Sequence, residues 1–238
     1  HSRIASLLCR IRTPDYLHSG IKQRSYVSNA KAHISSPEVL TADIKSYYQS
    51  TKTSMIYSFF KDMMKCVPDV ALILAELTSY QGHIPTGSRV SMPLAFWSNI
   101  KMFSDMHNLA VENDLCFSVY VDDLTFSGQK VHGSVIYKLQ CLIKSYGHVM
   151  HPDKTKLYSK DNVKIVTGVA IKNGNLLIKN EQHKNIYEDI VKWTLCRDID
   201  VPKTLKDRLI GRLNAMSIIE PRLKDKARSI KNYKLIPQ

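Results

Sequence analysis

The chain has 238 residues, of which 44% are hydrophobic, and 34 Lys and Arg against 21 Asp and Glu give it a formal net charge of +13. This composition excludes a disordered or collagen-like chain, because it supplies enough apolar side chains for a folded core. The five cysteines form no CxxC pair, and the longest apolar run is too short to span a bilayer. We therefore expect a globular protein of a reducing cytosol, without a disulfide framework, a zinc ribbon or a membrane segment.

In chain order, the first half of the sequence predicts helices around one early strand. Residues 1–11 already follow a helical apolar spacing, so we expect a segment upstream of the first residue. Residues 38–44 have strand chemistry and end near a buried-looking acid, Asp43. The elements predicted next are a helix over 47–65, a second helix over 69–79, a loop over 81–91 and a long helix to about residue 112.

The second half predicts a hairpin followed by short strands and helices. Two β-rich runs, 116–121 and 124–127, are separated only by Asp122 and Asp123, which is the pattern of a hairpin with both carboxylates at its tip. A natural boundary falls near residue 180. The remaining predicted elements are a helix over 133–146, strands over 155–158, 164–171 and 175–178, the last two joined by a turn at Asn173 and Gly174, and helices from 181 to the end.

The end of the chain is strongly basic. Between Val201 and Gln238 there are ten Lys or Arg and three Asp or Glu, a net charge of +7. Such a run is often only a solvated helical face, but it is also the kind of surface that binds the phosphates of a nucleic acid. Charge alone does not choose between the two, although it makes a nucleic acid the first partner to test.

Three acids stand at strand ends that should share one sheet. Asp43, Asp122 and Asp123 would be costly there unless a cation binds them. Mg²⁺ prefers hard oxygen ligands, and two such ions can activate the attacking oxygen and stabilise the leaving oxygen in phosphoryl transfer. For the Asp-Asp pair alone, a structural turn is the better interpretation, because Asp is a common turn residue.

Five short motifs follow one another in a fixed order along the chain. They are TADIKSYYQS (41–50), GHIPTGSRVSMPLA (82–95), YVDD (120–123), GHVMHPDKT (147–155) and VTGVAIKNG (166–174). In this order they resemble motifs A, B, C and D and the primer grip of the reverse transcriptase family, specifically the bacterial retron-type reverse transcriptases. Two shorter patterns, NAKAH (29–33) and VTG (166–168), match retron enzymes, and LIGRLNAM (209–216) is similar to the start of their thumb helix.

The resemblance implies an α+β right-hand polymerase. Residues 1–180 would form the catalytic fingers and palm, with a ferredoxin-like antiparallel palm sheet and helices, and residues 181–238 a basic helical thumb. The family's fingers begin with a basic strand pair upstream of the helix that residues 1–11 represent. We therefore expect that the chain is part of a longer one or that a partner completes the fold.

The implied activity is RNA-templated DNA synthesis from dNTPs with two Mg²⁺ ions, or with Mn²⁺ in their place. A structured non-coding RNA and an RNA/DNA duplex are the implied partners, with an effector protein or further subunits, in the bacterial cytoplasm and in antiphage defence. One alternative is another defence-associated reverse transcriptase in a multi-subunit complex, with little template dependence. A second is an RNA-binding scaffold without catalysis, against which the three intact acids argue. An intron maturase fits less well, because no maturase-like extension or nuclease motif follows the thumb.

The resemblance also assigns roles to single residues. Asp43, Ile44 (through its carbonyl), Asp122 and Asp123 would form the metal site, and Lys154 would be the general acid for pyrophosphate, with a solvated surface lysine as the alternative. Tyr48 would be the steric gate below the deoxyribose, or else a core aromatic. The other substrate-binding residues would be Arg24, Pro85, Thr86 and Gly87, and the nucleic-acid-binding residues Asn29, His33, Val166, Thr167, Gly168, Arg212, Arg222, Lys224 and Arg228.

Motif B departs from the family pattern at three positions. Thr86 stands where many relatives carry Gln, so a direct side-chain contact with the nucleotide is in doubt there. Arg89 and Met92 replace the small residue and the Ser that are common in retron enzymes.

Overall fold

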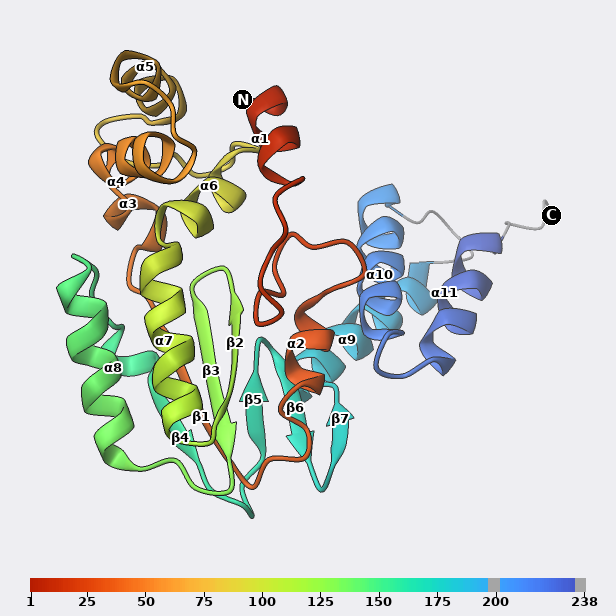
Figure 1. Ribbon diagram of the computed structural model, residues 1–238. Helices are drawn as coiled ribbons and strands as arrows, with labels where there is room; N and C mark the ends of the chain where they lie inside the picture. Colours follow the sequence, from red (N-terminus) through yellow and green to blue (C-terminus); the bar gives the residue numbers. More distant parts are fainter. Residues whose placement is uncertain (197–201, 234–238) are drawn as a thin grey trace. The chain divides into compact units, whose positions relative to one another are not determined.

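The computed structural model describes residues 1–196 and 202–233. The chain divides into two compact units, His1–Asn162 and Val163–Gln238 (Figure 1). The sequence-based boundary near residue 180 lies later, because the short strands between the two positions form a sheet of their own. Within the described residues, no helix is both long and apolar enough to cross a membrane.

The first unit is built on a four-stranded antiparallel sheet with the order β2-β3-β1-β4. Its strands are β1 (Glu38–Asp43), β2 (Cys116–Tyr120), β3 (Asp123–Gly128) and β4 (Lys156–Tyr158). β1 pairs with both β3 and β4, and β2 pairs with β3 alone. The predicted strands and hairpin are confirmed, but the turn is Val121–Asp122 and Asp123 is the first residue of β3, so only one of the two predicted carboxylates lies at the tip.

Side chains alternate between the two faces of this sheet. The face bearing Phe117 and Phe126 is apolar, and these rings lie 4.7 Å apart. Helices α7 (Ile100–Glu112) and α8 (Gly133–Ser145) lie on one side of the sheet (Figure 1). Ser118, Thr125 and Ser127 lie on the other face and are nearly fully buried. The apolar face supplies the core, and the hydroxyl face needs hydrogen-bond partners.

The predicted helix over 47–65 is wrong as a single element. It is divided into α3 (Tyr47–Ser50), α4 (Thr53–Ser58) and a π-helix, η1 (Phe59–Met63). Thr51 and Lys52 have extended backbones between α3 and α4. Apolar spacing continues across this break, so the pattern alone did not reveal it.

The long helix predicted up to residue 112 is also divided, into α6 (Ser91–Ser98) and α7, and the break falls at Asn99. The buried Asn99 amide donates to Thr51 Oγ1 at 3.0 Å and to Ala95 O at 2.9 Å. Asn99 Oδ1 lies 2.7 Å from His148 Nε2. These bonds join the two helix breaks, because a buried polar side chain is stable only when its bonds are satisfied.

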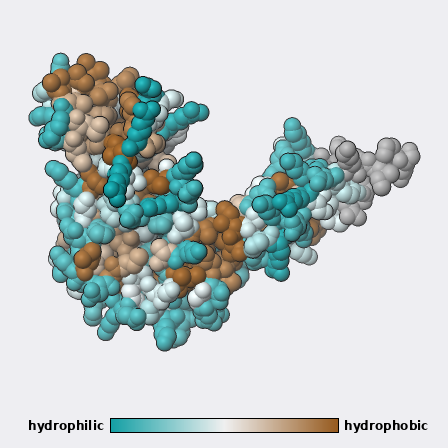
Figure 2. Space-filling model, turned by 45° about the vertical axis from the view of Figure 1, so that its right-hand side comes forward, coloured by the Kyte–Doolittle hydropathy of each residue, from teal (hydrophilic) through white to brown (hydrophobic). Residues whose placement is uncertain are grey.

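α5 (Pro68–Thr78) packs against the core through small side chains. Its buried residues are Ala71, Ala75 and Thr78, which permit a close approach. Its large apolar side chains face outward, and Ile73 is 62% exposed. Figure 2 shows brown residues over the end of the first unit that carries this helix. The other exposed apolar residues of this segment are Val67, Val70, Leu72 and Leu77.

The remaining helices of the first unit are short. They are α1 (Ser2–Leu8), α2 (Tyr26–Lys31) and the 3₁₀ turn η2 (Pro152–Lys154). α2 begins with a capping box, in which Ser25 and Ser28 bond each other's backbone N–H. This cap fixes the start of α2 between the first segment and β1.

The second unit combines a three-stranded sheet with helices. Its strands are β5 (Lys164–Val166), β6 (Val169–Lys172) and β7 (Asn175–Leu177), in the order β5-β6-β7. The single strand predicted over 164–171 is wrong, because a two-residue turn divides it. The helices are α9 (Asn180–Cys196), α10 (Lys203–Met216) and α11 (Arg222–Asn232), and their shared core is Ile186, Trp193, Leu209, Leu213, Ala227 and Ile230.

Candidate active site

Strand pairing brings the three predicted acids to one end of the sheet. Asp43 ends β1 and lies opposite Asp123, the first residue of β3. Asp122 is in the turn before β3, and its carbonyl accepts the Ile44 N–H at 3.1 Å. Since the N–H and C=O of a strand residue point to the same side, the Ile44 carbonyl also faces the hairpin. The sheet thus places the side chains predicted to hold metal on adjacent strand ends.

Burial and the negative charges of their neighbours raise the pKa values of two of these carboxyl groups. Burial, followed by the charges of Asp122 and Asp43, raises the pKa of Asp123 to about 6. Burial raises the pKa of Asp122 as well, and the charge of Asp43 adds to this rise. Asp43 is 5% exposed. Buried carboxylates that repel each other favour a cation or a proton between them.

Lys154 supplies a positive charge to this cluster. Its Nζ lies 2.8 Å from Asp43 Oδ2, and this hydrogen bond raises the pKa of Lys154. The backbone brings the lysine there, because His151 N donates to Asp43 O at 2.7 Å and Lys45 N donates to Val149 O at 2.8 Å. The ammonium is more than half exposed. Lys154 therefore contacts both solvent and a catalytic candidate.

The donor set is chemically suited to a hard divalent cation, since it consists of carboxylate oxygens. Among the described residues, however, no three His, Cys, Asp or Glu side chains are gathered in one coordination arrangement. The Asp43 carboxylate is bonded to Lys154 instead. This bond uses Oδ2, so a cation could bind the same carboxylate through Oδ1.

Tyr47 and Tyr48 are neighbours in the sequence but differ in burial, which bears on whether Tyr48 is a steric gate or a core aromatic. Tyr47 is 3% exposed, and its hydroxyl donates to Ala95 O at 2.8 Å. Tyr48 is only partly buried, and its ring centroid lies 5.8 Å from that of Tyr47. Burial raises the pKa of Tyr48, and the charge of Asp122 raises it further. Tyr47 is the core aromatic, and Tyr48 lies within the field of the acids.

The motif B loop is fixed at its ends and open in its middle. Ile84 is fully buried, and its N–H donates to Thr51 O at 3.2 Å. Ser91 Oγ donates to Pro85 O at 2.5 Å. Thr86 and Gly87 are exposed between these points. Gly87 has a φ of +83°, which only glycine adopts at little cost.

Asn29 and His33 cannot contact a nucleic acid in this structure, because both side chains are fully buried. His33 Nδ1 lies 2.7 Å from Ser127 Oγ, and Nε2 lies 2.6 Å from Ser118 Oγ. Ser127 donates its own hydrogen to Ser36, so it must accept from Nδ1, and Nε2 accepts from Ser118. His33 therefore bonds both strands of the β2–β3 hairpin. The two serines were missed, because only the fold brings them to His33.

This histidine gives a pH prediction. Burial lowers the pKa of His33 from 6.5 to about 3, so the folded protein keeps it neutral while the unfolded chain takes up a proton. The stability that neutral His33 contributes is fully present above its pKa in the unfolded chain, 6.5. It is lost as the pH falls from there toward the pKa of His33 in the folded protein, about 3. The free energy of unfolding should fall by about 2 kcal/mol between about pH 7.5 and pH 5 from this residue. Urea unfolding of His33→Gln should show a smaller fall, and an equal fall would contradict the assignment.

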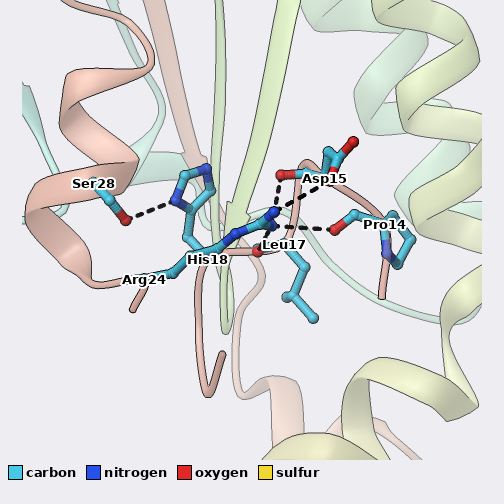
Figure 3. Close-up of polar contacts among 6 residues, drawn as sticks. All are labelled: Pro14, Asp15, Leu17, His18, Arg24 and Ser28. Atoms are coloured by element: carbon cyan, nitrogen blue, oxygen red, sulfur yellow. Dashed lines mark hydrogen bonds and ion pairs between the residues drawn. The ribbon is translucent and has the colours of Figure 1, made fainter. Parts of the chain in front are cut away.

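Arg24 does not face a substrate in this structure. Its Nη1 donates to the carbonyls of Leu17 at 2.6 Å, Asp15 at 2.8 Å and Pro14 at 3.3 Å. Its Nη2 lies 3.2 Å from Asp15 Oδ1 (Figure 3). The expected contact with template or triphosphate is therefore corrected. The guanidinium binds the chain's own backbone.

The VTG pattern forms the turn between β5 and β6. Val166 pairs with Val169, which leaves Thr167 and Gly168 as the two turn residues. Their φ values of +44° and +83° are those of a type I′ hairpin turn. Val166 is buried and Gly168 exposed. A direct contact of Val166 with nucleic acid is therefore corrected, whereas the role of the turn stays a prediction.

Arg212 belongs to an ion-pair cluster inside the second unit. Its Nη1 lies 2.6 Å from Asp189 Oδ2 and donates to Asn185 O at 3.1 Å. Arg208 binds the same carboxylate at 2.8 Å, and Asp189 is 2% exposed. The hydrogen bond from Arg208 and the charges of both arginines lower the pKa of Asp189. Arg212 therefore joins α10 to α9, and its predicted contact with nucleic acid is corrected.

The predicted cations of α11 are exposed. Arg222 is 81% exposed and pairs with Glu220. Arg228 is 65% exposed and pairs with Asp225 one turn earlier. Lys224 is exposed as well. These three side chains remain open to an anionic partner.

Comparison with known proteins gives a consistent set of relatives. No protein-family model matches the chain. The retron Se72 reverse transcriptase of Salmonella heidelberg is 31% identical over 188 residues, covering 74% of this chain and 49% of that protein. The retron Ec86 reverse transcriptase of Escherichia coli is 26% identical over 167 residues, covering 69% of this chain and 52% of that protein. The chain thus spans about half the length of these curated relatives.

Solved structures show the same fold. Telomerase from Candida albicans, in complex with a fragment of telomeric RNA, matches 99% of this chain and 58% of its own with a TM-score of 0.57 and 9% identity. A foamy viral protease-reverse transcriptase in complex with double-stranded DNA matches 92% of this chain and 39% of its own, with a TM-score of 0.52 and 15% identity. The predicted α+β polymerase fold is confirmed. The ordered motifs and these comparisons show that the chain is similar in sequence to bacterial retron reverse transcriptases.

Proposed function

We propose that the chain is the catalytic part of an RNA-directed DNA polymerase that copies a structured non-coding RNA in a bacterial retron, in the setting of antiphage defence. The observation that carries the proposal is the meeting of Asp43, Asp122 and Asp123 at paired strand ends beside Lys154. The raised pKa values of Asp122 and Asp123 support a site for positive charge. Relationship to retron enzymes supplies the choice of template class.

In this proposal each residue has a separate task. Asp43, Asp122 and the Ile44 carbonyl would hold Mg²⁺, or Mn²⁺ in its place, and Asp123 would support them. Two bound ions would supply activation of the primer hydroxyl and stabilisation of the leaving pyrophosphate. The Lys154 side chain is more than half exposed, and its ammonium would donate a proton to the leaving pyrophosphate. The loop of Pro85, Thr86 and Gly87 would lie below the dNTP.

The exposed cations of α11 support a contact with the phosphates of an RNA/DNA duplex. Replacing Arg222, Lys224 and Arg228 together by Gln should reduce the log–log salt slope of duplex binding by about 2–3, at roughly 0.9 per phosphate contact on B-DNA. Arg212→Gln is the contrast, because it removes a buried ion-pair partner and should lower stability by about 1–2 kcal/mol without changing the slope. An unchanged slope in the triple variant would make these cations a solvated surface only.

The polymerase proposal is tested by Mg²⁺-dependent dNTP incorporation on an RNA template. Incorporation supports a polymerase, whereas tight RNA binding without incorporation would indicate an RNA-binding scaffold. The retron proposal is tested by sequencing the nucleic acid that co-purifies with the protein. A defined DNA joined to an RNA is expected, and DNA of random sequence would favour a defence-associated enzyme with little template dependence.

A further inference from the structure

The turn that carries Asp122 is strained at the residue before it. Tyr120 pairs with Asp123, so Val121 and Asp122 are the two residues of the hairpin turn. Val121 has a φ of +61°, in the left-handed region. A β-branched side chain is a rare occupant there, and such a position usually carries glycine. This backbone therefore persists only if its surroundings hold it.

The Ser19 side chain bonds this residue from outside the hairpin, and the Val121 side chain also packs against the core. The Val121 N–H donates to Ser19 Oγ at 3.0 Å, and Ser19 is 6% exposed. Without this oxygen the Val121 N–H would lose its acceptor in a partly buried place, which is unfavourable. Gly20 follows with a φ of +69°, so the chain turns directly after Ser19. Ser19 therefore supplies the acceptor for the turn amide from a neighbouring segment.

The segment before Ser19 is itself paired with the hairpin. Val119 N donates to Tyr16 O at 2.8 Å, and His18 N donates to Val119 O at 2.9 Å. Leu17 and Val119 form a parallel bridge. The segment therefore extends the sheet beyond β2 for a short stretch and delivers Ser19 to the turn.

Arg24 fixes this segment from its other side. Its guanidinium donates hydrogen bonds to the carbonyls of Pro14, Asp15 and Leu17, as Figure 3 shows. A planar guanidinium holds several acceptors in one fixed geometry, which an ammonium does not. The contacts form a continuous chain from Arg24 through residues 14–19 to the turn.

We propose that Ser19 is a positioning residue that holds the Val121–Asp122 turn in the conformation that brings Asp122 beside the ends of β1 and β3, and that Arg24 acts through it by fixing residues 14–19. This inference rests on the proposed function, because it gives the turn a task in catalysis. Neither residue needs to touch the substrate. The strain at Val121 explains why a dedicated acceptor is required.

The direct test is amide hydrogen exchange of Val121, measured by NMR in the wild type and in Ser19→Ala. Exchange at Val121 should become about tenfold faster or more when its acceptor is removed. Thr78→Val is the control, because it also removes a buried hydroxyl, which bonds Leu74 O within α5, away from the turn and from residues 14–19. It should lower the melting temperature and leave exchange at Val121 unchanged. Equal exchange in the wild type and in Ser19→Ala would overturn the proposal.

The rate of DNA synthesis and its dependence on Mg²⁺ give the second readout. Ser19→Ala should raise the Mg²⁺ concentration for half-maximal synthesis and lower the maximal rate about tenfold, with the Kd for primer–template unchanged. Arg24→Gln should show the same pattern more weakly. If exchange accelerates but neither the Mg²⁺ dependence nor the rate changes, the positioning role is wrong.

Two further measurements separate this proposal from the proposed function. Binding of Mn²⁺ to the protein without nucleotide, followed by electron paramagnetic resonance, should weaken in Ser19→Ala and not in Thr78→Val. Mn²⁺ binding can be measured even if the protein does not synthesise DNA. A wild type without synthesis would therefore reject the proposed polymerase function, while the Mn²⁺ measurement would still test the role of Ser19. In the Val121→Gly background, where positive φ costs little, Ser19→Ala should have a smaller effect on Mn²⁺ binding. An equal effect would show that strain at Val121 is not the reason.

Discussion

Replacing Asp122 by Asn is expected to lower DNA synthesis by at least about three orders of magnitude, which corresponds to about 4 kcal/mol of transition-state stabilisation. The two side chains have nearly the same shape, so the hairpin turn should keep its fold while the site loses a charge. Burial and the charge of Asp43 already raise the pKa of Asp122, so removing the charge should relieve repulsion in the metal-free protein. The measurement is single-nucleotide incorporation on a primed RNA, together with the melting temperature.

Asp153→Asn is the matched control for this experiment. Asp153 is exposed in η2, one residue before Lys154, and the same change of charge there should leave the rate within about twofold of the wild type. RNA binding should be unchanged in both variants. A wild-type rate of incorporation in Asp122→Asn would show that this carboxylate holds no essential metal.

Shortening Tyr48 should change the choice of sugar. If its ring lies below the C2′ position of the nucleotide, a 2′-hydroxyl clashes with it, and discrimination comes from this repulsion. Tyr48→Ala should then raise the use of rNTP relative to dNTP by about 10- to 100-fold. The influence of the Asp122 charge on Tyr48 and the partial burial of this ring support the prediction.

The neighbouring tyrosine provides the control for sugar choice. Tyr47→Phe removes the hydroxyl that donates to Ala95 O and should cost about 1 kcal/mol of stability, with no change in the rNTP to dNTP ratio. Tyr48→Ala should be less destabilising than the about 3–5 kcal/mol of a buried aromatic truncation. If Tyr48→Ala loses that much stability and keeps the ratio, Tyr48 is a core residue and not a gate.

The sheet and its acids could be predicted because their signals are local. Two β-rich runs around Asp122 and Asp123 predict a hairpin, but its turn is Val121–Asp122, one residue earlier than predicted, and Asp123 already pairs with Tyr120 in β3. The turn inside 164–171 was missed because Thr167 is typical of strands and Gly168 alone does not mark a hairpin. Similarly, the breaks at Thr51 and Asn99 depend on a hydrogen bond between residues far apart in the sequence.

The roles of Arg24, His33 and Arg212 could not be predicted from their residue types. A cation or histidine in a nucleic-acid enzyme suggests a contact with phosphate, but its partner is decided by the fold. His33 contacts serines of β2 and β3, and Arg212 contacts the buried carboxylate of Asp189. A buried polar or charged group requires such partners, so each of these residues is satisfied within the protein.

We propose that the acids at the hairpin catalyse synthesis directed by an RNA template. The most direct measurement uses two primed RNA templates that differ at one base, with each dNTP supplied separately in the presence of Mg²⁺. We predict that the wild type adds only the complementary nucleotide on each template and that Asp43→Asn adds none. Addition of the same nucleotide on both templates would contradict synthesis directed by the RNA template. An undiminished rate in Asp43→Asn would contradict the catalytic role of the acids.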